Sequence, residues 1–179
     1  MKDHRNIPFY TMALILFALL KVGFIYAETD DLLFLLKPIN VVVGLLTGSD
    51  SVFVIGKGYF YGHLNIVIDK SCGGFNFWFL SFLLLTILSL RHIEGKFHKL
   101  MIIPLALLGS YIFSIGVTSS RIFVSIIIQN YTNSYLEKYQ HIVHESIGIM
   151  TNLSFLMLAY FLIDKLFTFH KRNCNEKLS

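Results

Sequence analysis

The chain has 179 residues, of which 55% are hydrophobic and only 15% charged, and its mean hydropathy is +0.64. Soluble domains are nearer to about 45–50% apolar and about 25% charged, so the composition excludes an ordinary soluble domain and indicates an integral membrane protein. The net charge of +4 does not indicate a nucleic-acid-binding protein. Its lysines and arginines flank apolar runs, as the positive-inside bias predicts, and form no basic stripe.

The first predicted element is a helix over about 7–27, which follows a short basic start containing Lys2 and Arg5. A cleaved signal peptide has an apolar core of about 7–15 residues and a small-x-small cleavage site after it. Here the apolar run is longer, and bulky residues precede Ala27. We therefore expect an uncleaved anchor with its N-terminus in the cytoplasm.

The next apolar segment, over 32–47, is ambiguous because Lys37 and Pro38 interrupt it near its start. The remaining apolar stretch is short for a bilayer crossing, which favours a re-entrant or interfacial helix on the outer face. A true span stays possible if a partner segment returns through the membrane. The region of about 50–70 contains short β-branched and aromatic pieces separated by glycines, which predict a small β-like cap. Open strand edges are not tolerated in lipid, so we expect this cap outside the bilayer.

Further helices are predicted over about 73–90, 100–117 and 144–166, with a short continuation over 122–129. A basic loop at 91–99 and a basic tail after 164 lie on the cytoplasmic side of these helices by the positive-inside rule. If both termini lie in the cytoplasm, the chain crosses the membrane four times. It crosses six times if 32–47 and a partner segment also span the bilayer. The predicted fold is therefore all-α and polytopic. It is a single integral membrane domain over 1–179, with a bundle of 4–6 transmembrane helices and a small extracytoplasmic β-like cap.

Three residues of different chemistry, Cys72, Arg121 and His144, are predicted at the same membrane face. At about 1.5 Å of rise per residue, Cys72 lies about 28 Å from the basic loop. By the same rise, Arg121 lies about 33 Å from Lys99, and His144 about 31 Å from Lys165. The hydrocarbon core is about 30 Å thick, so all three should reach the face opposite the basic segments. A thiol, a guanidinium and an imidazole together can carry out nucleophilic chemistry.

Cys72 is the candidate nucleophile. Two glycines follow it, which would leave the backbone open to close approach by a substrate. A helix that starts here would lower the pKa of the thiol and favour the thiolate. The alternative is that a lone membrane cysteine is only a small hydrophobic residue. The other cysteine, Cys174, is expected on the opposite side of the membrane, so the two could not form a disulfide.

Arg121 is the candidate stabiliser of negative charge. It could be an interfacial arginine whose side chain reaches the lipid headgroups. However, it lies on the side that should be poor in positive charge, and apolar residues follow it directly. A costly charge at membrane depth indicates a functional site. Here a permanent cation could stabilise the thiolate or the oxyanion formed when the thiolate attacks a carbonyl.

His144 is the candidate proton carrier, because an imidazole can take the thiol proton and later protonate a leaving amine. It could instead be an ordinary residue at the start of a helix. His141 competes, since it would lie on the same helical face, and His63 is a weaker competitor. His141, His144 and Glu145 also have loose metal-ligand spacing, but no second motif completes a site, so we expect no metal.

Three motifs in order resemble those of the exosortase/archaeosortase family. They are Ser-Cys-Gly-Gly at 71–74, Ser-Arg-Ile at 120–122 and His-Glu-Ser-Ile-Gly at 144–148. The resemblance covers about 65–163, and the short length and the Gly-Tyr-Phe before the cysteine make the chain most similar to the compact exosortase K type. The chain is shorter than most members. Gly73 directly follows the cysteine, where members commonly have a small residue before the glycine. These departures leave the substrate motif and the acceptor open.

The resemblance implies a membrane-embedded cysteine protease and transpeptidase in the cytoplasmic membrane of a prokaryote, with its active site on the extracytoplasmic side. Its partner would be an exported protein whose C-terminal sorting signal has a short motif, a transmembrane helix and a basic end. Cys72 would form a thioacyl intermediate, Arg121 would stabilise charge and His144 would act as general acid and base. The acyl group would pass to an amine-bearing acceptor or to water, without a cofactor.

Two alternatives from other classes stay open. A non-enzymatic transport or assembly subunit would use Arg121 and Lys37 to pair with charges on a partner. A membrane thiol oxidoreductase is disfavoured, because the chain has no second outer cysteine with which to form an exchangeable disulfide.

Overall fold

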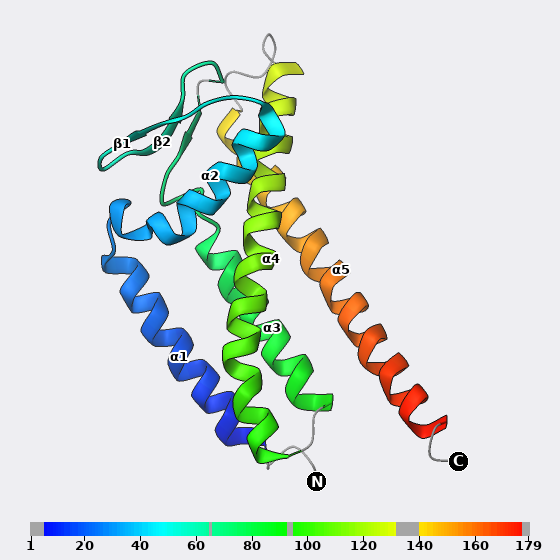
Figure 1. Ribbon diagram of the computed structural model, residues 1–179. Helices are drawn as coiled ribbons and strands as arrows, with labels where there is room; N and C mark the ends of the chain where they lie inside the picture. The colour runs from blue at the N-terminus through cyan, green and yellow to red at the C-terminus, as the bar shows by residue number, and fades with distance from the viewer. Residues whose placement is uncertain (1–5, 65, 93–94, 132–139, 177–179) are drawn as a thin grey trace.

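The computed structural model describes residues 6–64, 66–92, 95–131 and 140–176. Within these ranges the chain is mostly helical, with five α-helices, one 3-10 turn (Asp30–Leu32) and a three-stranded sheet. Figure 1 shows an elongated bundle with the sheet at one end. Helix α1 begins and helix α5 ends at the opposite end of this bundle.

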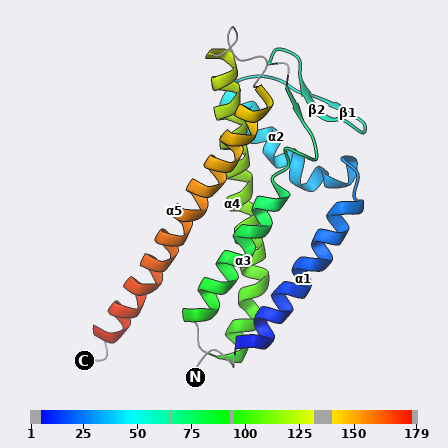
Figure 2. The ribbon, with the colours of Figure 1, turned by 180° about the vertical axis from the view of Figure 1, so that it is seen from behind.

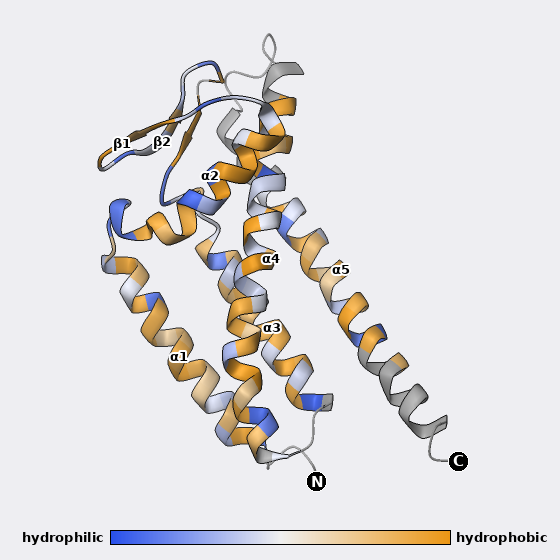
Figure 3. Cartoon of the chain, in the orientation of Figure 1, coloured by the Kyte–Doolittle hydropathy of each residue, from blue (hydrophilic) through white to orange (hydrophobic). Residues whose placement is uncertain are grey.

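Three helices in the described part are long and apolar enough to cross a membrane, as expected for a helical membrane protein. They are α1 (Ile7–Tyr26), the segment Phe97–Ile128 of α4 and the segment Gly148–Leu166 of α5. Helix α3 (Phe75–His92) is a shorter apolar helix. Apolar residues predominate along much of these helices (Figure 3), and many large hydrophobic side chains of α1 and α5 are exposed. Exposed apolar faces of this extent fit contact with lipid.

Helix α4 (Lys96–Tyr131) is one continuous helix of 36 residues. The predicted break between 100–117 and 122–129 is therefore wrong. Thr118 and Ser119 are buried in the bundle, and the Ser120 hydroxyl donates to the Gly116 carbonyl at 2.8 Å. A hydroxyl that bonds back to the preceding turn is compatible with a continuous helix, so these polar residues do not end it. Helix α5 (Gln140–Glu176) also extends beyond the predicted 144–166 at both ends.

Helix α2 (Leu33–Thr47) has 15 residues and contains Pro38. Its rise of about 22 Å is short of the hydrocarbon thickness. In Figure 1 it runs obliquely across the sheet end of the bundle, and it packs against α4. One face is fully buried through Leu35, Leu36, Ile39 and Val43. This geometry favours the re-entrant or interfacial interpretation of 32–47.

The region predicted as a β-like cap forms an antiparallel sheet of order β1-β2-β3. The strands are β1 (Val52–Val54), β2 (Gly58–Tyr61) and β3 (Ile66–Ile68). In the register, Val52 lies opposite Phe60, and Tyr59 lies opposite Ile68. A side chain at Gly58 would overlap the Ile68 carbonyl, which explains a glycine at the start of β2. The β2–β3 pairing leaves β3 as an edge strand that leads directly toward α3.

The buried residues form two hydrophobic clusters. The cluster at the sheet end joins α2, β2 and β3 to the start of α3, and it includes Tyr61, Phe75 and Trp78. The second joins α1, α3 and the start of α4 around Phe82 and Ile103. Seen from behind in Figure 2, α3 and α4 lie between α1 and α5. The start of α3 and the C-terminal part of α4 belong to the cluster at the sheet end.

Candidate functional site

Cys72 lies in the short connection between β3 and α3. Asp69 fixes this connection, because its Oδ1 accepts hydrogen bonds from the backbone N–H of Ser71 at 2.9 Å and of Cys72 at 3.1 Å. The Cys72 N–H also lies 3.1 Å from the Asp69 carbonyl oxygen. Sequence reasoning missed Asp69. The available signal was an aspartate two residues before a serine, which is the pattern of an Asx turn.

The two glycines after Cys72 allow close packing of the loop against neighbouring helices. Gly74 has φ +64°, and a Cβ there would overlap the Thr118 Oγ1 of α4. A Cβ at Gly73 would lie 3.3 Å from the Leu36 Cδ2 of α2. We expected these glycines to leave space for a substrate. The structure shows instead that the space beside them is filled by the protein, so the glycines let the Cys72 loop pack closely against α2 and α4.

Arg121 of α4 contacts the Cys72 loop. Its Nη2 donates a hydrogen bond to the Cys72 carbonyl oxygen at 3.3 Å, across 49 residues of sequence. Its Nε is buried and has no hydrogen-bond partner among the described residues. The structure therefore brings Cys72 and Arg121 together, as predicted, but it places the guanidinium on the backbone carbonyl. One N–H of the guanidinium is left available to another acceptor.

Helix α5 approaches the same arginine through Gly148, which is buried. The position of a Cβ on Gly148 lies 3.4 Å from the Arg121 Cδ and 3.5 Å from its Nη1. His144 is in α5, four residues before Gly148. It is therefore about 6 Å closer than Gly148 to the N-terminal end of α5, and it is on the same helical face. The side chains of His141 and His144 lie outside the described part of the structure.

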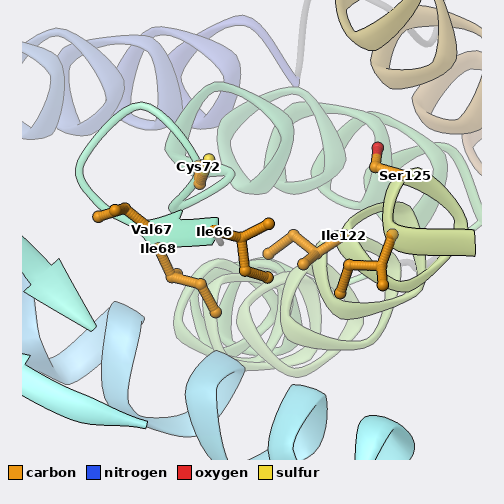
Figure 4. Close-up of a pocket in the computed structure, with 7 residues that line it drawn as sticks. Ile66, Val67, Ile68, Cys72, Ile122 and Ser125 are labelled. Atoms are coloured by element: carbon orange, nitrogen blue, oxygen red, sulfur yellow. The ribbon is translucent and has the colours of Figure 1, made fainter. Parts of the chain in front are cut away.

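A cavity of about 150 Å³ lies beside Cys72, between β3 and the C-terminal part of α4. Figure 4 shows Cys72 and Ser125 at its edges and isoleucines between them. The Ser125 hydroxyl is buried and has no hydrogen-bond partner among the described residues. The lining residues are Ile66, Val67, Ile68, Cys72, Ile122, Ser125 and Ile126.

Burial raises the pKa of the Cys72 thiol above its ordinary value, and the nearby Asp69 carboxylate raises it further. The Ser71 hydroxyl, 3.8 Å from Sγ, and the Arg121 cation act in the opposite direction but do not prevail. The expectation of a lowered pKa is therefore wrong. Cys72 precedes α3, whose first backbone hydrogen bond runs from Trp78 to Gly74, so the thiol is not within the helix start. These surroundings favour the protonated thiol at neutral pH.

Among the histidines whose side chains the structure describes, His63 is not part of the site. His63 lies on the exposed turn between β2 and β3. Among the described side chains, no group of three or more His, Cys, Asp or Glu residues is placed to hold a metal ion. The loosely spaced His141, His144 and Glu145 have side chains outside that set.

Comparison with protein-family models, with curated proteins and with solved structures finds no match for this chain. The resemblance described above therefore depends on the three sequence motifs. The structure contributes an independent observation about them. The Cys72 loop, Arg121 and the Gly148 turn of α5 lie in contact at one end of the bundle.

Proposed function

We propose that this chain is a membrane-embedded cysteine protease and transpeptidase of the exosortase type. The observation that supports this most strongly is the position of Arg121. It donates to the Cys72 carbonyl and packs against Gly148, so it links the three motif segments. Arg121 is partly buried, and its buried Nε has no hydrogen-bond partner among the described residues. A guanidinium in this state beside a thiol is well suited to stabilising an anion that forms during a reaction. An ordinary lipid-facing arginine would not make these contacts.

The proposed reaction begins with proton transfer, because the resting thiol is neutral. The His144 imidazole takes the proton from Cys72, and the thiolate attacks the carbonyl carbon of the scissile peptide bond. The resulting oxyanion is stabilised by the Arg121 guanidinium. When the C–N bond breaks, the leaving amine takes the proton back from the imidazolium. An amine-bearing acceptor or water then attacks the thioacyl group and releases Cys72.

The proposed substrate is an exported protein with a C-terminal sorting signal made of a short motif, an apolar helix and a basic end. In the proposed topology α1, α3, α4 and α5 cross the cytoplasmic membrane of a prokaryote, and both chain ends face the cytoplasm. The loop at 91–99 and the tail after 164 are basic, which supports this orientation. The basic end of the substrate would then lie on the same side as these segments.

The test is intact-mass analysis of the purified chain after mixing with exported precursors that carry such a C-terminal signal. The expected result is an added mass equal to the acyl portion of the precursor, attached to Cys72. Cys72→Ala should abolish both the adduct and the cleavage, whereas Cys174→Ala should retain both. Cleavage that persists in Cys72→Ala would overturn the proposal. The same holds if no adduct forms while the precursor binds, which is the result expected of a non-enzymatic subunit. A mixed disulfide at Cys72 would indicate a thiol oxidoreductase instead.

A further inference from the structure

The cavity beside Cys72 lies between two parts of the fold. One wall is the edge strand β3, through Ile66 and Ile68. The other wall is the C-terminal part of α4, through Ile122 and Ile126, which are 6% and 7% exposed. Since Cys72 itself lines the cavity, any group that occupies the cavity lies next to this residue.

The cavity has the size and polarity of a side-chain pocket. Its volume is about 150 Å³, and all its lining residues except Cys72 and Ser125 are aliphatic. An apolar protein cavity of about 150 Å³ can hold a molecule the size of benzene. A leucine side chain is of this order, whereas an indole is larger. The single buried hydroxyl, that of Ser125, cannot compensate a charged group for the loss of water.

From this geometry we infer that the cavity is the specificity pocket of the acyl donor. It receives the side chain of the residue whose carbonyl Cys72 attacks, and it selects a medium-sized apolar side chain there. The inference rests on the proposed function, because it requires an acyl donor. Ile126 is the specificity-determining residue on α4. The neighbouring Ile127 does not line the cavity and is 39% exposed.

The experiment measures alkylation of Cys72 by three N-acetyl aminoacyl chloromethyl ketones, with glycine, leucine or tryptophan as the amino acid. The Cys72 sulfur displaces chloride from the methylene carbon, a thioether forms and the thiol proton goes to solvent. Full-length Cys174→Ser protein is used, so that Cys72 is the single thiol. Each rate is divided by the rate of the same reagent with N-acetylcysteine in the same detergent solution. This step removes differences in intrinsic reactivity and partitioning.

The expected result is that the leucine reagent labels Cys72 at least about 10-fold faster than the tryptophan or the glycine reagent, as a fitting apolar group in a pocket provides. Ile126→Ala enlarges the pocket and should bring the tryptophan rate up to the leucine rate. Ile127→Ala removes the same atoms from an adjacent position and should leave the wild-type order unchanged.

Equal corrected rates for the three reagents in the wild-type chain would overturn the inference. So would equal effects of Ile126→Ala and Ile127→Ala. Alkylation needs no peptide-bond cleavage, so this outcome is distinguishable from failure of the proposed function. If an acyl adduct forms but the labelling shows no side-chain selectivity, the specificity pocket is rejected and the proposed enzyme function is retained. If labelling of Cys72 is selective but no acyl adduct forms, the proposed function is rejected. The assignment of the cavity to the side chain of an acyl donor is then rejected with it.

Discussion

At the scale of single residues, the site depends on a thiol whose surroundings disfavour its charged form. Burial and the Asp69 carboxylate raise the pKa of Cys72, and Arg121 only partly offsets them. A neutral resting thiol is protected from incidental oxidation and alkylation, since the thiolate is the reactive form. Under the proposed mechanism, the nucleophile therefore forms only when a base takes its proton.

The raised pKa predicts the pH dependence of alkylation in Cys174→Ser protein. Near neutral pH, iodoacetamide should label Cys72 more slowly than it labels N-acetylcysteine, because a smaller fraction of Cys72 is thiolate. The rate should keep rising as the pH passes the ordinary thiol range. Asp69→Asn keeps an oxygen acceptor and removes the charge, so it should move the profile to lower pH. Arg121→Gln should move the profile to higher pH, and a wild-type midpoint below that of free thiol would contradict this assignment.

Part of this residue-scale geometry could be predicted from the sequence, and part could not. The association of Cys72 with Arg121 followed from helix lengths measured against the bilayer. The direction of the thiol pKa did not, because it depends first on how far the folded loop buries Cys72. It also depends on the Asp69 carboxylate, whose approach is a property of the folded loop.

At the scale of the elements, the site is assembled where α5 crosses α4. Gly148 is the contact point, because the position of its Cβ lies 3.4 Å from the Arg121 side chain. The continuity of α4 matters equally, since a break near Gly116 would uncouple Arg121 from the buried part of the helix. The sequence suggested that break because serine, threonine and glycine are common in loops. Within a buried helix the same residues permit close packing.

Gly148→Leu tests this crossing. A Cβ at this position already meets the Arg121 side chain at 3.4 Å, so the further atoms of a leucine should push α5 outward and carry the His144 segment away from the Cys72 loop. We expect the rate of acyl-adduct formation to fall about 100-fold, as a displacement of about 1 Å can cause in a catalytic site. Gly116→Leu is the matched control, because a Cβ at Gly116 meets no atom within 4 Å. An equal rate in the two variants would show that the crossing does not position the reactive groups.

At the scale of the whole molecule, the composition predicted the main architecture. Apolar runs of about 20 residues identified the helical membrane protein, and glycine-separated β-branched segments identified the region that forms the sheet. The exact ends of α4 and α5 were not predictable in this way, because both helices continue beyond the apolar stretch. Their polar ends carry no hydrophobic periodicity that would mark them as helix.

The whole-molecule claim on which the rest depends is that the Cys72 end of the bundle faces the extracytoplasmic side and the C-terminal end of α5 faces the cytoplasm. Ser71 is exposed next to Cys72. Cys174 is in the last turn of α5, which ends at the opposite end of the bundle (Figure 1). A chain with Ser71→Cys as its single cysteine and a chain with Cys174 as its single cysteine therefore report the two sides.

The most direct measurement is labelling of these two chains in intact cells with a membrane-impermeant maleimide, before and after permeabilisation. The account predicts that the cysteine at position 71 is labelled in intact cells and that Cys174 is labelled only after permeabilisation. The reverse pattern, with position 71 protected until the membrane is opened, would contradict the proposed site.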